Sequence, residues 1–335
     1  MSPERERQRS DASDLVPVVL VGLGEEVRGI ARALSLHPEI RLVAAVDPAF
    51  AGRPLRSLVP EAPEGIRVEA RPHDAFRRSR GGVAVLARGG ALEEIERDLF
   101  AAVSAGLSVV GTCEELVFPA FVDPDLAERI DEAAARRGVA VVGVGLVAGF
   151  LFDRLAGTLA QASGLVRRVE ARRVVELRGK PALARRAGLG LTAEEFDRGV
   201  DAGRLGQPGL SEACGLLAEG LGLELAEVEE AVDPILADAP VEVDGARLER
   251  GQVIGLKQVA LGLEEGRQLV RLEVVMRAGA EPRDEIRIEG EPPLELVVPG
   301  GTPEEALGWL VANAAVRVAA AGPGLVHVLE LPLAY

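Results

Sequence analysis

The sequence has few of the residues that form covalent cross-links or bind metal ions. It contains two cysteines, Cys113 and Cys214, and three histidines, with no Cys/His cluster at zinc-ligand spacing. Two cysteines are too few for a disulfide framework, so we expect a reducing, cytoplasmic location. We predict no metal site. Lysine is also scarce, since Lys180 and Lys257 are the only two, and this leaves few candidates for lysine chemistry.

Long apolar runs and an excess of basic charge are absent as well. No apolar run reaches the roughly 20 residues that a transmembrane helix needs, so we expect no membrane span. The formal net charge is −15, which argues against nucleic acid as the main partner, because phosphate binding needs a basic surface. Residues 1–14 are polar and contain no apolar stretch. This pattern indicates a frayed tail rather than a signal peptide.

The apolar content that is present suffices for two cores. Hydrophobic residues make up 48% of the 335 residues, and this length favours two domains. Amphipathic helical patterns alternate with short apolar runs at residues 15–21, 41–46, 83–86, 107–110 and 139–144. The alternation is typical of a parallel sheet with helical crossovers. We therefore predict a Rossmann-type α/β domain over residues 15–145.

After residue 145 the pattern changes. Apolar and charged residues alternate within 264–290 and again within 294–298, which is typical of strands with one wet face. We predict a C-terminal α+β domain with an open mixed or antiparallel sheet over residues 146–302, which binds substrate and forms the oligomer contact. A last helical pattern near 303–320 could return to either domain, so residues 303–335 could complete the first one.

The turn after the first apolar run has the composition of a dinucleotide site. Gly22 permits a tight turn, Gly24 lets the backbone approach a pyrophosphate, and the following helix offers its N-terminal N–H groups. Asp47 ends the next strand, where a carboxylate binds ribose hydroxyls. A carboxylate there repels a 2′-phosphate and so favours NAD over NADP, although Arg53 could weaken that preference.

This turn departs from the full motif. Val27 occupies the place of the third glycine, and Glu25 and Glu26 precede it. Acids in a first helical turn interact favourably with the helix dipole. Carboxylates aimed at the phosphate position, however, would compete for the same N–H donors. Two interpretations therefore stay open, a functional dinucleotide site and a degenerate one.

Residues 111–119, after the fourth strand, form a second candidate site, because ligands bind at the carboxyl ends of parallel strands. Thr112 and Glu115 have the spacing of a capping box. Two interpretations of Glu114 stay open. Its side chain either faces the ligand cleft expected at this edge of the sheet and moves an amine proton, or it is a solvated loop acid. Cys113 lies beside this acid and is not expected to be a nucleophile.

Two further features are weaker indicators. The glycine-rich stretch 143–153, at the predicted domain boundary, is typical of either a hinge or a small-ligand site. Arg173, Arg178 and Lys180 form a basic cluster that could hold a carboxylate. For this cluster we favour a solvated strand face.

Several segments together resemble one known family. They are residues 112–116 (TCEEL), 149–153 (GFLFD), 188–196 (GLGLTAEEF), 209–212 (GLSE), 300–301 (GG) and 323–325 (PGL). With these segments the chain resembles the 2,4-diaminopentanoate dehydrogenase family, which includes native amine dehydrogenases and is akin to dihydrodipicolinate reductase. The resemblance extends over residues 18–332.

The resemblance implies reversible oxidative deamination of a primary amine or diamino acid, with hydride passing to NAD or NADP. Glu114 is then the residue that positions and deprotonates the amine, and a homodimer is the expected assembly. The implied cofactor site consists of Gly22, Gly24, Glu25, Val27, Asp47, Ala87, Arg88 and Thr112. The implied substrate site consists of Glu115, Val147, Phe150 and Gln207.

The sequence also departs from the family around the predicted cleft. The departures are Val27 for the third glycine, Val147-Ala148 for an asparagine–proline pair, Gln207-Pro208 for a histidine, and residues 87–90 (ARGG) for small hydroxyl residues. They indicate either an altered substrate or lost activity. The alternative function is therefore a non-catalytic homologue that acts as a binding or regulatory protein.

Overall fold

The computed structural model describes residues 15–24, 27–88 and 91–333. The chain divides into two compact units, Met1–Gly145 with Glu305–Tyr335 (the first unit) and Leu146–Glu304 (the second unit). The tail predicted at residues 1–14 lies outside the described residues. Within the described residues, no helix has both the length and the apolar character needed to cross a membrane.

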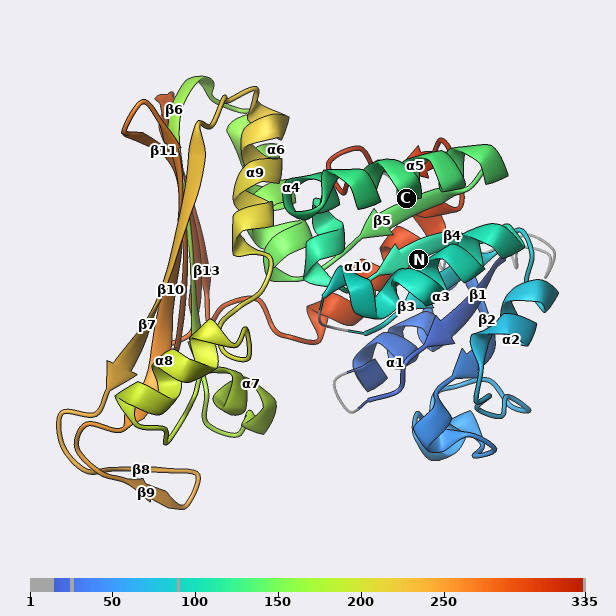
Figure 1. Ribbon diagram of the computed structural model, residues 1–335, viewed down its shortest axis with the longest axis horizontal. Helices are drawn as coiled ribbons and strands as arrows, with labels where there is room; N and C mark the ends of the chain where they lie inside the picture. Colours follow the sequence, from blue (N-terminus) through green and yellow to red (C-terminus); the bar gives the residue numbers. More distant parts are fainter. Residues whose placement is uncertain (1–14, 25–26, 89–90, 334–335) are drawn as a thin grey trace, which may run out of the picture. The chain divides into compact units, whose positions relative to one another are not determined.

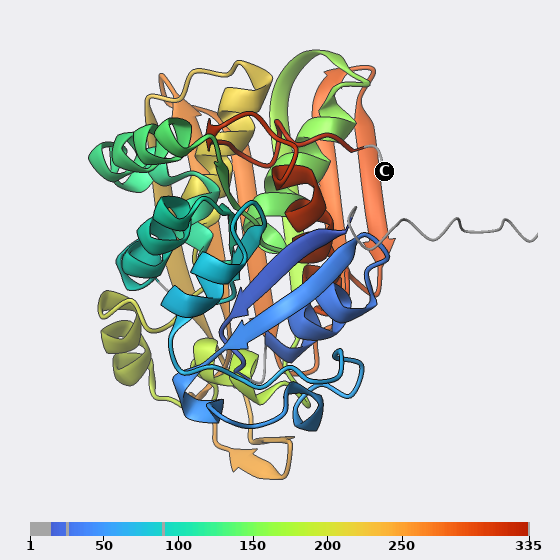
Figure 2. The ribbon, with the colours of Figure 1, turned by 90° about the vertical axis from the view of Figure 1, so that its right-hand side faces the viewer.

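The first unit contains a six-stranded parallel sheet. Its strands are β1 (Val16–Val21), β2 (Ile40–Val46), β3 (Val83–Leu86), β4 (Ser108–Gly111), β5 (Ala140–Gly143) and β14 (Gly324–Leu325). The spatial order is β14-β5-β4-β3-β1-β2, and Figure 2 shows β1 and β2 side by side. Every residue of β3, β4 and β5 is buried, which explains their continuous apolar runs. The predicted Rossmann-type sheet is confirmed.

Helices cover both faces of this sheet (Figures 1 and 2). They are α1 (Arg28–Leu36), α2 (Pro72–Arg78), α3 (Leu92–Ala105), α4 (Pro119–Val122), α5 (Pro124–Arg137) and α10 (Ala306–Val318), with short 3₁₀ turns η2 (Pro48–Phe50), η3 (Leu55–Ser57) and η4 (Glu114–Val117). On one face α3 packs against α2 and α5, and on the other α10 packs against α1. A Cβ on Gly308 of α10 would lie 2.6 Å from the carbonyl oxygen of Gly29 in α1, so these two helices meet at backbone contact.

The second unit contains a six-stranded mixed sheet. Its strands are β6 (Gly164–Glu176), β7 (Glu227–Leu236), β10 (Val253–Glu264), β11 (Arg267–Arg277), β12 (Arg283–Glu291) and β13 (Leu294–Pro299), in the order β13-β12-β6-β11-β10-β7. Strands β6 and β11 are parallel, and the other neighbours are antiparallel. The predicted open mixed sheet is therefore confirmed. Strands β8 (Val241–Val243) and β9 (Ala246–Leu248) form a separate hairpin.

The helices of the second unit leave one face of this sheet bare. They are the π-helical segment η5 (Val147–Leu155), α6 (Ala156–Ala160), α7 (Pro181–Arg186), α8 (Ala193–Asp201) and α9 (Leu210–Leu221). α6 and α9 pack against one face, over the buried rows of the strands. No helix of the described residues covers the opposite face (Figure 1), where the outward residues of β6 and β12 are mostly charged.

Arg173 is buried, so the predicted solvated strand face is wrong for this residue. Its side chain is 4% exposed, and its guanidinium pairs with Asp284 (3.0 Å) and Glu304 (2.8 Å). Nη2 also donates to the carbonyl of Thr302 (2.9 Å). The prediction failed because these partners lie more than 100 residues further along the chain, where the pattern of one strand gives no information about them.

Replacing Arg173 by leucine leaves the buried carboxylate of Asp284 without its cation. We expect R173L to lower the free energy of unfolding by about 3–5 kcal/mol, as for other buried pairs that lose one partner. R247L is the matched control, because Arg247 pairs with Glu249 at the exposed surface of the same unit, and a change within experimental error is expected there. Urea denaturation followed by circular dichroism measures both. Equal losses in the two variants would contradict the assignment.

Candidate functional site

The carboxyl ends of β1 and β3 lie side by side at the point where the strand order reverses. From β1 the chain adds β2 on one side, and β3, β4 and β5 follow on the other side. In doubly wound sheets, ligands bind in the crevice beyond such a switch point. The predicted cofactor residues Gly22, Ala87 and Asp47 come directly after β1, β3 and β2.

Gly22 has no room for a side chain. Its φ is +102°, and a Cβ would lie 2.4 Å from the carbonyl oxygen of Ala87. Its N–H donates to the carbonyl of Val46 (2.9 Å), and the N–H of Ala87 donates to that of Val21 (2.8 Å). The turn is thus fixed to the strands on both sides of β1, and only glycine can occupy this position.

The described residues leave open space beside Gly24. This glycine is exposed, and a Cβ there would have no neighbour within 4 Å among the described residues. α1 begins four residues later, with Val27 as its N-cap and no side-chain cap. The open side of Gly24 fits a group that approaches the backbone closely, as a pyrophosphate does. The predictions for Glu25 and Glu26 fall outside the described residues.

Asp47 links the glycine turn to the end of β2. Its Oδ2 accepts a hydrogen bond from the N–H of Leu23 (2.8 Å), and its Oδ1 accepts one from the N–H of Ala49 (2.9 Å). Each carboxylate oxygen can accept a further hydrogen bond. The half-buried side chain therefore shapes the turn and still has acceptors for ribose hydroxyls.

Two glycines allow the segment that carries Glu114 to lie directly on the sheet. Gly111 and Gly143 are register partners at the ends of β4 and β5. A Cβ on Gly143 would lie 2.3 Å from the backbone of Leu116, and one on Gly111 would lie 2.5 Å from its side chain. Half-buried Glu114 is the first residue of η4. Burial raises the pKa of the neighbouring Cys113 to about 12, which excludes a thiolate at neutral pH.

Thr112 and Glu115 do not form the predicted capping box. The Thr112 hydroxyl donates to the carbonyl of Arg88 (3.3 Å), and Oε2 of Glu115 accepts from the N–H of Leu92 (2.6 Å). The N-cap of α3 is Ala91, which has no side-chain acceptor. Glu115 supplies that acceptor from a different segment, so this prediction is wrong.

Arg28, the first residue of α1, was missed by the sequence analysis. Its Nε is buried and has no hydrogen-bond partner in the part of the chain that the structure describes. A cation at a helix N-terminus opposes the helix dipole. That unfavourable position is the signal that could have marked Arg28 as a candidate phosphate ligand.

The predicted substrate residues of the second unit lie on two segments. Val147 is buried and Phe150 half-buried on η5, and Gln207 is buried in the loop 206–209. Within η5 the positive φ of Gly149 is held by Asp153, whose Oδ2 accepts from the Gly149 N–H (2.6 Å). Complete burial raises the pKa of Asp153 to about 6. Asp153 is a second residue whose part in this segment the sequence analysis did not assign.

The structure thus brings together the predicted residues of the first unit. The carboxyl edge of the first unit's sheet gathers the residues that follow its strands, namely Gly22, Gly24, Asp47, Ala87, Arg88, Thr112, Glu114 and Glu115. Arg88 also pairs with Asp98 (3.3 Å). This fold, with a glycine turn at its switch point, defines a protein of the Rossmann-type α/β class.

Comparison with known proteins identifies the family. Residues 150–335 match the family described as the 2,4-diaminopentanoate dehydrogenase C-terminal domain, and the chain belongs to this family. The predicted family is therefore confirmed, and with it the prediction of an oxidoreductase.

Individual relatives cover nearly the whole chain. The 2,4-diaminopentanoate dehydrogenase of Acetoanaerobium sticklandii is 26% identical over 95% of this chain and 94% of its own length. The structure of an amine dehydrogenase from Mycobacterium smegmatis is 25% identical, with a TM-score of 0.81 over 96% of this chain and 97% of that one. A dipicolinate-bound dihydrodipicolinate reductase from Paenisporosarcina sp. TG-14 shares the fold, with 12% identity and a TM-score of 0.51 over 93% and 97% of the two chains.

The two glycines of the turn can be tested separately. We expect G22A to destabilise the protein by about 2 kcal/mol or more, because of its positive φ and the close carbonyl of Ala87. We expect G24A to keep the melting temperature of the wild type but to weaken NADH binding, since its Cβ would enter the space where the pyrophosphate is predicted to bind. Thermal melting without ligand and titration with NADH measure the two effects. Unchanged NADH affinity in G24A would refute this role.

Proposed function

We propose that the protein catalyses the NAD(P)-dependent oxidative deamination of a primary amine or amino acid. A bound nicotinamide dinucleotide supplies the hydride acceptor. The substrate loses a hydride from its amine-bearing carbon and a proton from its nitrogen, and water hydrolyses the resulting imine to a carbonyl compound and ammonia. The position of Glu114 carries this proposal, because its segment lies on the same sheet edge as the open turn at Gly24.

The first unit would hold the cofactor. The backbone at Gly24 and the N-terminus of α1 would bind the pyrophosphate, and Asp47 would bind the ribose hydroxyls. Glu25, Val27, Ala87, Arg88 and Thr112 complete the proposed cofactor site.

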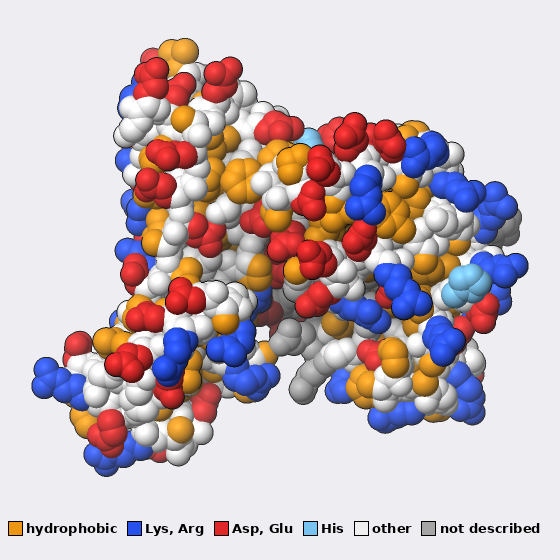
Figure 3. Space-filling view, in the orientation of Figure 1, with side chains coloured by type: hydrophobic (Ala, Val, Ile, Leu, Met, Phe, Trp, Pro, Cys, Tyr) orange, Lys and Arg blue, Asp and Glu red, His pale blue; other side chains and the backbone are white. Residues whose placement is uncertain are grey.

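We propose NAD in preference to NADP, since Asp47 would repel a 2′-phosphate. Arginines on the segment from η2 to α2 reduce this preference; Figure 3 shows basic side chains gathered there. Among them, Arg53 lies over the ring of Phe50, 5.8 Å from its centroid.

Glu114 would bind the substrate ammonium group and take its proton before hydride transfer. A carboxylate is suited to both steps, because it attracts the cation and accepts the proton in one place. Glu115, Val147, Phe150 and Gln207 are the proposed substrate contacts. One oxygen of Glu115 is already used at the start of α3, so its other oxygen is the one that would contact a ligand.

The first test separates cofactor binding from chemistry. NADH at 100 times its Kd should stabilise the protein by about 2.7 kcal/mol. NADPH at the same concentration should stabilise it by less. In an amine panel, E114Q should lower kcat/KM at least about 100-fold, the loss expected for a general base, with the NADH affinity unchanged. E128Q, on the exposed side of α5, is the control and should match the wild type. Full turnover in E114Q would remove Glu114 from this role.

The alternative of a non-catalytic binding protein gains no support from the relatives, which are named as enzymes. If neither NADH nor NADPH raised the melting temperature, that result would favour the alternative.

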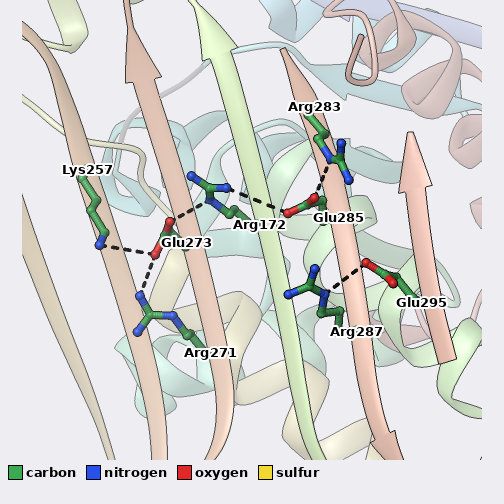
Figure 4. A network of polar contacts seen from close by, with 8 residues as sticks. All are labelled: Arg172, Lys257, Arg271, Glu273, Arg283, Glu285, Arg287 and Glu295. Atoms are coloured by element: carbon green, nitrogen blue, oxygen red, sulfur yellow. Dashed lines mark hydrogen bonds and ion pairs between the residues drawn. The ribbon is translucent and has the colours of Figure 1, made fainter. Parts of the chain in front are cut away.

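We further propose a cytoplasmic homodimer whose copies meet through the bare face of the second unit's sheet. This charged face is drawn in Figure 4. It is formed by Arg172, Lys257, Arg271, Glu273, Arg283, Glu285, Arg287 and Glu295. Half-buried Val259 and Val275 lie among these charges, on β10 and β11.

Glu273 is at the centre of the charged face. Its carboxylate lies within 2.8 Å of Arg172, 2.6 Å of Arg271 and 3.5 Å of Lys257. Burial opposes ionisation here, but the three cations together lower the pKa of Glu273. Because both signs of charge alternate across the face, a second copy related by a two-fold axis can place its cations opposite these acids.

V259R tests the proposed dimer. A new arginine at this outward position of β10 should give a monomer at concentrations where the wild type is a dimer, because its long side chain would hold the two faces apart even if its charge pairs with Glu273, its neighbour on β11. E128R, on α5 of the first unit, should stay dimeric. Sedimentation equilibrium distinguishes the two states. A monomeric wild type, or a V259R variant that stays dimeric, would disprove this interface.

A further inference from the structure

Residues 52–71, which follow η2, extend the edge of the first unit's sheet. Glu69 makes an isolated parallel bridge with Val46, the last residue of β2. The N–H of Asp47 donates to the carbonyl of Glu69 (2.9 Å). This segment is therefore fixed next to Asp47, which is the residue proposed to bind the ribose hydroxyls of the cofactor.

Three arginines of the segment lie close to this contact. The carbonyl of Arg53 accepts a hydrogen bond from the N–H of Val68 (2.9 Å), and Arg67 precedes Val68 in the chain. Arg71 follows Glu69 by two residues, so the parallel register places its backbone beyond the carboxyl end of β2. All three arginines are exposed, so their charges reach the solvent on the ribose side of the proposed cofactor site.

The acids of the segment pair with arginines other than these three. The pairs are Glu61–Arg32, Glu64–Arg56 and Glu69–Arg78. In the part of the chain that the structure describes, Arg53, Arg67 and Arg71 form no ion pair. The segment therefore carries a local excess of positive charge, and Figure 3 shows basic side chains gathered on this part of the first unit.

The protein as a whole carries the opposite charge. Its formal net charge is −15, and a nicotinamide dinucleotide is itself an anion at its diphosphate. Most of the surface therefore repels the cofactor. A local excess of positive charge beside a binding site raises the association rate of an anion, by about 10- to 1,000-fold in strongly steered cases.

We propose that Arg53, Arg67 and Arg71 form an arginine guide, which attracts the anionic dinucleotide to the first unit without contacting it once it is bound. This inference rests on the proposed dehydrogenase function. The association rate then follows the charge of the ligand, so NADPH associates faster than NADH, because its 2′-phosphate adds negative charge. The affinity follows Asp47, which repels the same phosphate. The rate and the affinity therefore rank the two nucleotides in opposite orders.

Stopped-flow fluorescence of NADH binding at about 0.01 M salt tests the guide, because charges act over about 30 Å at this ionic strength. We expect R53Q/R71Q to lower the association rate constant about 3- to 10-fold and to leave the dissociation rate constant within twofold. At about 0.15 M salt the screening length falls to about 8 Å, and the difference from the wild type should fall below twofold. Arg67 is left in place, because its Nη1 donates to the carbonyl of Gly52 (2.8 Å).

Two further variants distinguish the guide from a direct contact and from a general effect of net charge. R53K/R71K keeps both charges and should keep the wild-type association rate. R77Q/R137Q removes the same charge from exposed arginines at the C-terminal ends of α2 and α5. These helix ends precede β3 and β5 and so lie at the opposite edge of the sheet. R77Q/R137Q should lower the association rate constant less than twofold.

The outcomes separate this inference from the proposed function. If R53Q/R71Q keeps the wild-type association rate or raises the dissociation rate, or if R53K/R71K loses the rate as well, the guide is wrong. It is also wrong if R77Q/R137Q lowers the rate equally, or if NADPH associates more slowly than NADH at low salt. In each of these cases the proposed function stands. If the wild type binds neither nucleotide, the proposed function fails, and the inference fails with it.

Discussion

The candidate site depends on backbone meeting backbone at the carboxyl edge of the first unit's sheet. Gly22 lies against the carbonyl of Ala87, and Gly143 lies against the backbone of Leu116. A side chain at either glycine would push a loop off the sheet. With both contacts made, the glycine turn and the segment of Glu114 take their spacing from the strands, since β4 is two strands from β1, about 10 Å at ordinary strand separation.

Carboxylates in this protein often serve as acceptors for main-chain N–H groups that no helix or strand satisfies. Asp47 binds the glycine turn, Glu115 binds the start of α3, and Asp153 binds the turn at Gly149. A buried N–H without a partner is costly, so these acids are needed for the local structure. Some of the acidic residues therefore stabilise the local backbone. An acidic residue near the carboxyl edge of the sheet is not by itself evidence of a catalytic group.

Much of the first unit could be predicted because its determinants are local. Strands buried on both faces are apolar throughout, and Gly22, Gly24 and Asp47 follow a motif whose spacing has a physical cause. In the second unit the alternation indicated strands with one wet face. The parallel pairing of β6 with β11 could not be inferred, because alternation is the same for either strand direction.

The contacts that sequence reasoning missed join distant parts of the chain. Glu115 has the spacing of a local capping box, but its partner Leu92 lies 23 residues earlier. Gln258 occupies an ordinary inward position on β10, and its partner Gln207 lies 51 residues earlier. Spacing within one segment shows neither partner.

The return of the chain to the first unit has a consequence for its synthesis. Residues 305–335 supply α10, which packs against α1, and β14, which pairs with β5. The ribosome releases residues 146–304 as one uninterrupted stretch before either of these elements exists. Domains commonly fold in order from the N-terminus during translation. Here the first unit lacks α10 and β14 until residues 305–325 have been synthesised, so the sequence of the second unit is complete before that of the first.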